Sequence, residues 1–201
     1  QGEQCSLCYN DGGATAELAG DAFLRLLQAE GQSKPSKLRG VVYLWGIDTL
    51  DCAGTEVPVA ALQVCTQALQ LVQGILQSGQ SPRLWIVTQQ AIAAGTPVVQ
   101  VQQAPLWGLA RTLQAEQPEL ACTCIDLTSA VDLDALFAEL CAAGQENQIL
   151  LRGEERLVAR LTRHREQATR TLVLDLAGSY LVTGGLGGLG LQVAQWLVAQ
   201  G

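Results

Sequence analysis

Short apolar runs and segments of helical periodicity alternate along this chain, and no other feature constrains its fold as strongly. The apolar runs are nearly continuous in character and rich in β-branched residues, which is typical of strands covered on both faces. Strands that alternate with helices predict an α/β, Rossmann-like parallel sheet with flanking helices. The predicted strands are residues 5–9, 41–45, 84–88, 122–127, 149–152, 157–161 and 180–183.

Four helices are expected between these strands. Asp21 would cap a helix that stops at Gly31, and Pro105 would open a helix that ends before Pro118. The other two carry larger apolar sets: Leu62, Cys65, Leu69, Val72 and Leu76 with Val64, Ala68, Leu71 and Ile75 in residues 59–77, and Leu133, Leu136, Phe137, Leu140 and Cys141 at core spacing between Asp132 and Gly144. Because the set in residues 59–77 forms two stripes, we expect that helix to be buried on more than one side. A polar turn at residues 152–156 predicts a hairpin that adds an antiparallel strand.

The composition indicates a folded core and gives no sign of a polyanionic partner. Hydrophobic residues make up 48% and charged residues 15% of the 201 residues, and the net charge is -7. Basic residues are sparse before residues 152–170, so nucleic acid is not an expected partner.

We find neither a run of about 18 apolar residues nor a signal-peptide pattern, so we expect no membrane association and a cytoplasmic location. The chain begins at Gln1 without Met, as expected for a piece of a longer polypeptide.

Seven cysteines raise the question of a metal site. Cys5 and Cys8 have the C-x-x-C spacing, but a structural zinc site needs four ligands and the single histidine, His164, lies among arginines. No metal is therefore expected. Cys122 and Cys124 alternate with other residues of a strand, so we expect both to be buried on one face as small hydrophobic side chains.

The glycine-rich stretch near the end of the chain has the arrangement that phosphate binding requires. Residues 180–183 are a predicted strand, residues 184–190 a turn and residues 191–200 a helix. Gly185, Gly187 and Gly190 satisfy the G-x-G-x-x-G pattern. Glycines let the backbone approach a pyrophosphate, and the helix N-terminus offers unpaired N–H groups. The alternative is a glycine-rich turn that binds no ligand.

Here the sequence resembles a known family. "YLVTGGLGGLG" also fits the T-G-x-x-x-G-x-G pattern of short-chain dehydrogenases and looks like the ketoreductase domain of modular type I polyketide synthases. Four upstream stretches are similar, in the same order, to the structural subdomain of these ketoreductases: "LRGVVYLWGID" (38–48), "RLWIVTQQA" (83–91), "APLWGLARTLQAEQPEL" (104–120) and "ILLRGEERLVARL" (149–161). The similarity covers most of the chain from Leu38 onward.

The resemblance implies two Rossmann-like halves, of which the second holds NADPH and the active site. Residues 1–162 would be the structural subdomain without its usual first strand and helix, residues 163–171 a linker, and residues 172–201 the beginning of the NADPH-binding catalytic subdomain. Cofactor contacts then fall on Thr183, Gly184, Gly185, Leu186, Gly187, Gly188, Leu189 and Gly190. The turns after residues 41–45 and 84–88 lack three closely spaced glycines, so the first half is expected to be a scaffold.

The family's catalytic Tyr, Lys, Ser and Asn lie downstream of the glycine loop, so no catalytic residue is expected in this chain. The implied partners are the catalytic half of the ketoreductase, an acyl carrier protein and other polyketide synthase domains. Two functions stay open. The parent protein reduces a β-ketoacyl group to a β-hydroxyacyl group with NADPH, or the chain belongs to a non-catalytic module kept for architecture.

Overall fold

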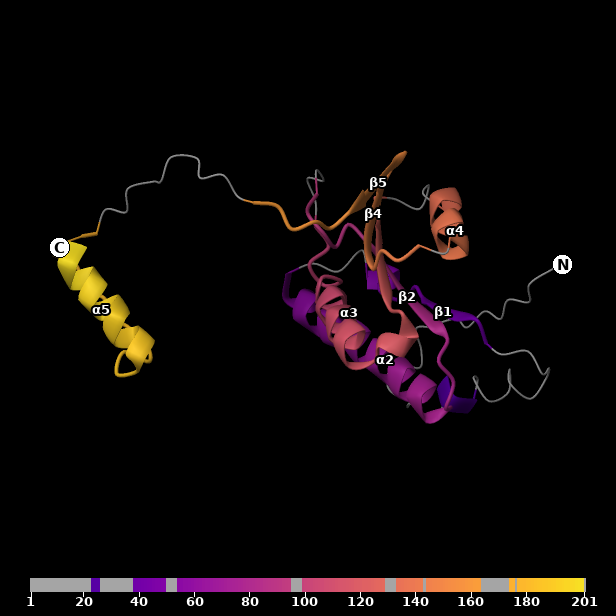
Figure 1. Cartoon of the computed structure of the whole chain (residues 1–201), viewed down its shortest axis with the longest axis horizontal. Helices are drawn as coiled ribbons and strands as arrows, with labels where there is room; N and C mark the ends of the chain where they lie inside the picture. The colour runs from indigo at the N-terminus through magenta and orange to yellow at the C-terminus, as the bar shows by residue number, and fades with distance from the viewer. Residues whose placement is uncertain are drawn as a thin grey trace. The chain divides into compact units, whose positions relative to one another are not determined.

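The computed structural model describes residues 23–25, 38–49, 54–94, 99–128, 133–142, 144–163, 174–175 and 177–200 (Figure 1). The chain divides into two compact units, residues 1–160 and residues 161–201. The predicted strand at residues 5–9, Cys5, Cys8, His164 and most of the predicted linker lie outside the described residues.

The first unit is built on a five-stranded sheet in the order β1-β2-β3-β4-β5. Its first four strands are parallel, and β5 pairs antiparallel with β4. Their bounds are Gly40–Tyr43 for β1, Arg83–Gln89 for β2, Thr123–Leu127 for β3, Gln148–Arg152 for β4 and Glu155–Val158 for β5. The predicted parallel sheet and the late hairpin are confirmed. Gly153 makes the hairpin turn with a φ of 62°, a conformation that glycine adopts at little cost.

Helices cover both faces of this sheet (Figure 1). The α-helices are α2 (Val57–Gln77), α3 (Pro105–Glu116) and α4 (Leu133–Cys141), and the short 3-10 turns are η1 (Ile47–Thr49), η2 (Gly54–Glu56) and η3 (Pro118–Leu120). One core cluster joins α2 and α3 to residues such as Tyr43, Ile86 and Cys124. The other joins α4 to the opposite side of the strands, where Ile125 and Ile149 lie. Cys122 and Cys124 are both buried in the first cluster, as predicted.

One apolar stripe of α2 is buried along its length, whereas the other is buried only where Val72 and, in part, Cys65 reach the core. Val64, Leu71 and Ile75 pack in the core, whereas Leu62 and Leu69 are 69% and 44% exposed. The expectation of burial on more than one side therefore holds only in part, because the described core reaches Val72 but leaves Leu62 and Leu69 at the surface. Residues 54–77 are also long and apolar enough to cross a membrane by length and composition, a property that core helices share, and α2 packs as a core helix here.

The outer side of α4 is apolar as well. Leu136 is buried against β3 and β4, and Leu140 packs beside it. Leu133 and Phe137 are 60% and 68% exposed, and Cys141 is exposed too. The expectation that all five apolar residues of this helix face the core is corrected, because a nine-residue helix on a flat sheet buries a single narrow stripe.

The second unit contains the helix α5 (Gly188–Gln200). A turn at residues 183–187 precedes it, so the helix begins three residues earlier than predicted. Residues 180–182 form no strand, which corrects the prediction for residues 180–183. A strand exists only when its backbone groups pair with a neighbour, and the described part of this unit offers none.

Candidate functional site

The predicted cofactor residues form one continuous loop and the first turn of α5. Gly184 has a φ of 71°, which lies in the left-handed region that favours glycine. Two turn hydrogen bonds shape the loop: the Gly185 N–H donates to the Val182 carbonyl at 3.2 Å and the Gly187 N–H to the Gly184 carbonyl at 3.0 Å. The Leu191 N–H then donates to the Gly187 carbonyl at 2.9 Å. The glycine spacing thus leads directly into a helix N-terminus.

Two of the glycines are required by the packing of the loop on itself. A Cβ on Gly190 would overlap the carbonyl oxygen of Gly184 and lie 2.7 Å from the Cα of Gly185. A Cβ on Gly185 would lie 2.9 Å from the carbonyl oxygen of Val182. These positions let the first turn of α5 approach the loop closely, which is the packing role of glycine in such a motif.

Gly188 differs from these two glycines. A Cβ at Gly188 would meet no atom within 4 Å, so nothing in the described structure requires glycine there. Leu186 and Leu189, at 95% and 77% exposed, and the exposed Thr183 leave the outer side of the loop open. The first N–H groups of α5 have no intrahelical acceptors, and they lie at the positive end of the helix dipole. The loop therefore leaves the N–H groups at the start of α5 open to an anion that approaches from outside.

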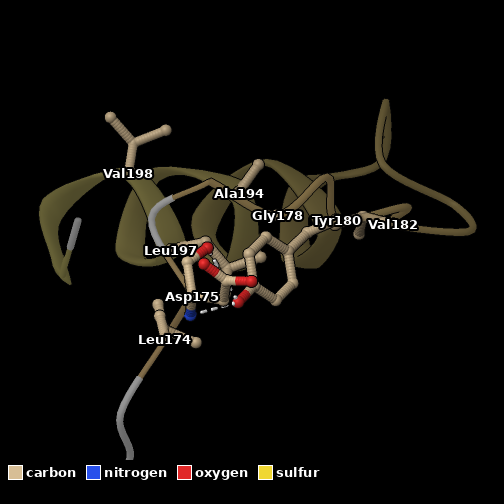
Figure 2. A pocket seen from close by; sticks show the side chains of 8 residues that line it. All are labelled: Leu174, Asp175, Gly178, Tyr180, Val182, Ala194, Leu197 and Val198. Atoms are coloured by element: carbon tan, nitrogen blue, oxygen red, sulfur yellow. Dashed lines mark hydrogen bonds between the residues drawn. The ribbon is translucent and has the colours of Figure 1, made fainter.

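An apolar hollow of about 400 Å³ lies on another side of this unit (Figure 2). The hollow is lined by Leu174, Asp175, Gly178, Tyr180, Val182, Ala194, Leu197 and Val198. The Asp175 N–H donates to Tyr180 Oη at 2.7 Å, and that hydroxyl donates to the Asp175 carbonyl at 3.3 Å. The hydroxyl of Tyr180 thus closes a local turn with the backbone of Asp175.

In the first unit, the carboxyl edge of the sheet is filled by side chains. A Cβ on Gly46, which follows β1, would lie 2.9 Å from Leu106 Cδ1. The fully buried Gln103 accepts a hydrogen bond from the Gln89 N–H at 2.9 Å at the end of β2. Asp126 is fully buried in β3 and pairs with Arg152 at the end of β4. Sequence reasoning missed this pair, although a single carboxylate inside an apolar strand is a signal that it needs a buried partner.

Comparison with known families now assigns the chain. Residues 10–161 match the family described as "Polyketide synthase extender module SpnB, Rossmann fold domain", and residues 178–201 match the KR domain family. The chain belongs to the first of these families. The order of the two matches is the order in which the sequence resemblance was found.

Several curated polyketide synthases are similar to this chain. One phenolphthiocerol/phthiocerol polyketide synthase protein of Mycobacterium tuberculosis is 44% identical over 134 residues, which are 61% of this chain and 7% of that protein. Another protein of the same synthase and species is 33% identical over 199 residues, 96% of this chain and 10% of that protein. Erythronolide synthase EryA3 of Saccharopolyspora erythraea is 37% identical over 84% of this chain and 6% of its own length. The chain thus spans a tenth or less of the length of these relatives.

Solved ketoreductases share the fold. A structure of A-type ketoreductases from a modular polyketide synthase matches with a TM-score of 0.65 and 28% identity, over 90% of this chain and 39% of that one. A C2-type ketoreductase matches with a TM-score of 0.63 and 25% identity, over 75% of this chain and 34% of that one. Together with the family matches, these similarities show a fragment of a modular polyketide synthase ketoreductase with a Rossmann-like fold.

Proposed function

We propose that the protein containing this chain reduces a β-ketoacyl group, carried on an acyl carrier protein, to a β-hydroxyacyl group with NADPH. The family matches and the ketoreductase neighbours support this reaction class. NADPH would supply the hydride. Residues 1–162 would serve as the scaffold, residues 163–171 as a linker, and residues 172–201 as the start of the cofactor-binding half. A cytoplasmic location would accompany this function.

The observation that carries the proposal is the open side of Gly188 at the N-terminus of α5. A loop that only made a turn would need small residues where its own backbone crowds, as at Gly185 and Gly190. It would not need one at Gly188, where a side chain has room. A pyrophosphate lying against the first N–H groups of α5 would occupy that space and exclude a side chain. The geometry therefore fits a nucleotide better than a bare turn.

The test compares valine at two helical glycines of the larger ketoreductase that contains this chain. Gly188→Val should weaken NADPH binding at least tenfold, because the new side chain fills the space proposed for the pyrophosphate. Gly108→Val is the matched control, since Gly108 lies in α3 and a Cβ there also meets nothing within 4 Å. NADPH fluorescence titration measures both. Unchanged affinity in a folded Gly188→Val variant would refute the proposal.

Gly190→Val is also expected to abolish NADPH binding. The cause would be a collision inside the loop and not the loss of space for the pyrophosphate. The new side chain would collide with the loop's own backbone at Gly184. The variant should therefore lower the melting temperature as well as the affinity for NADPH. A Gly190→Val protein with the wild-type melting temperature would contradict this account of the loop.

We further propose that the isolated chain does not reduce ketones, because the family's proton donor and its orienting groups lie outside it. Removing a general acid with its neighbours costs orders of magnitude in rate. The isolated chain should also bind NADPH very weakly, since a Rossmann half supplies the adenine and nicotinamide contacts from later strands. NADPH oxidation with a β-ketoacyl thioester, at high protein concentration, checks this. Turnover above background by the isolated chain would overturn this proposal. If the parent is instead a degenerate module kept for architecture, the complete domain should show no turnover either.

A further inference from the structure

The carboxyl ends of three neighbouring strands bring together a hydroxyl, a carboxylate and a guanidinium. Thr88 lies in β2, Asp126 in β3 and Arg152 in β4. The side chain of Asp126 is fully buried and that of Arg152 is 9% exposed. Charged groups are rarely buried to this extent unless each is paired and hydrogen-bonded. The question is what this buried pair holds.

Asp126 accepts hydrogen bonds from two directions. Within the sheet, Thr88 Oγ1 donates to Oδ1 at 2.6 Å and Arg152 Nη2 donates to Oδ2 at 2.6 Å. From the chain that leaves β2, the Ala91 N–H donates to Oδ1 at 2.9 Å and the Ile92 N–H to Oδ2 at 3.4 Å. Both carboxylate oxygens therefore bind the backbone that follows β2.

Arg152 contacts the same segment from the other side. Its Nη2 donates to the Ile92 carbonyl at 3.1 Å, and its Nη1 donates to the Asp126 carbonyl at 2.9 Å. Residue 92 thus has its N–H bound by the carboxylate and its carbonyl bound by the guanidinium. The helix α3 joins through Trp107, whose Nε1 donates to Thr88 Oγ1 at 3.1 Å.

This cluster lies at the carboxyl edge of the sheet. Open α/β sheets bind their ligands at the carboxyl ends of the strands, in the space beyond the last hydrogen-bonded residues. Here the segment after β2 lies across that edge, and Gln90 takes a φ of 54° as the chain turns there. The Gln90 N–H also donates to the Leu127 carbonyl of β3 at 2.9 Å.

We infer that Asp126 and Arg152 form a clasp that holds residues 90–92 closed over the carboxyl edge of the sheet. The carboxylate binds the N–H groups and the guanidinium a carbonyl of this segment, so the segment keeps one conformation without a ligand. A buried ion pair adds little stability over a hydrophobic pair of the same size, and in some proteins its role is instead to select one arrangement of the groups around it. The function of the clasp is therefore to fix this segment more than to stabilise the whole fold.

The test is hydrogen exchange by NMR on the full chain, with Arg152→Met as the first variant. The Ala91 and Ile92 amides should exchange at least tenfold faster than in the wild type, while the Val87 and Ile125 amides in the sheet keep their relative protection. Arg156→Met is the matched control. Arg156 lies in β5 of the same hairpin but pairs with Glu139 of α4 at 2.6 Å, so its loss should leave residues 91 and 92 unchanged.

Arg152→Met leaves the charge of Asp126 buried without a partner, which can prevent folding. A second variant that removes both charges keeps the test decisive in that case. The double variant Asp126→Leu with Arg152→Met replaces the ion pair by hydrophobic side chains, an exchange that folds tolerate. It should show the same local increase at residues 91 and 92. Wild-type protection of these amides in either folded variant would overturn the inference. An equal increase at Val87 and Ile125 would also overturn it, because the pair would then stabilise the fold as a whole.

Discussion

At the scale of single residues, Thr88 shows how a small side chain connects two elements. Its hydroxyl donates to Asp126 and accepts from Trp107, and the residue is fully buried. Thr88→Val keeps the shape but leaves the Trp107 N–H without an acceptor and Asp126 with one donor fewer. We expect a loss of about 1–3 kcal/mol in the free energy of unfolding. Urea denaturation measures it, with the exposed Thr112→Val as control; equal midpoints for the two variants would contradict the prediction.

The buried thiols predict how stability depends on pH. Burial raises the pKa of Cys122 from 9.0 to about 12, and burial together with the neighbouring Cys122 raises that of Cys124 well above 9.0. Both thiols stay protonated in the fold while they ionise in the unfolded chain, so unfolding releases protons above pH 9. Their contribution is complete below pH 9 and declines as pH rises toward 12, by about 1.4 kcal/mol per pH unit for each thiol.

Urea unfolding between pH 8 and 10 checks this slope. Cys122→Ala should make the decline shallower, because one of the buried groups with a raised pKa no longer titrates. Cys141→Ala, at an exposed position, should leave the slope as it is in the wild type. A slope that Cys122→Ala does not change would show that this thiol is not what makes stability fall with pH.

The glycine loop also shows what sequence reveals at this scale. The spacing of Gly185, Gly187 and Gly190 predicted a turn that enters a helix, and the structure has both. The spacing did not reveal that a Cβ at Gly190 would collide with Gly184 while one at Gly188 would meet nothing within 4 Å, because that distinction depends on the path of the backbone. Asp126 and Arg152 escaped for a similar reason, since they are 26 residues apart and meet only when β3 pairs with β4.

At the scale of elements, α2 shows that an apolar pattern in the sequence does not by itself identify which residues are buried. Its two stripes are equally apolar in the sequence, so composition alone could not tell which one faces the sheet. The structure buries the whole stripe of Val64, Ala68, Leu71 and Ile75, and only Val72 of the other stripe is fully buried with it. Strands were easier to find, because the apolar runs of the central strands β2 and β3 are buried on both faces, as predicted, whereas the edge strand β1 leaves Val42 37% exposed. The predicted strand at residues 180–183 failed because a strand also needs a partner, which a local pattern cannot supply.

This difference between the stripes of α2 gives a direct test. Ile75 is completely buried, so Ile75→Ala should lower the free energy of unfolding by about 2–5 kcal/mol through lost burial and a residual cavity. Leu76→Ala, one residue further along and 41% exposed, should cost much less. Thermal and urea unfolding of the two variants compares them. Equal losses would mean that the outer stripe is covered in solution.

At the scale of the whole molecule, the two units carry different parts of one inferred enzyme. The first has a sheet whose carboxyl edge is filled by its own side chains, and the second has a glycine loop with an open side. The two family matches cover these two parts of the chain separately, as residues 10–161 and residues 178–201. This difference fits the proposed roles of the two units. The first would be a structural half without a ligand site, and the second would begin the half that binds the cofactor.

The connection between the units predicts the chemistry of the parent synthase. The resemblance to modular ketoreductases implies that related synthases which fully reduce their substrate carry an enoylreductase domain between the two ketoreductase halves, after the structural subdomain. Here about twenty residues join Leu161 to Tyr180, enough for a linker and a short strand but far too few for a domain, which needs roughly 50 residues or more. We therefore expect a β-hydroxy thioester, or an α,β-unsaturated one if a dehydratase accompanies the ketoreductase. Mass spectrometry of the acyl groups on the module's carrier protein decides this: a saturated chain made by the purified module, with no enoylreductase added, would refute it.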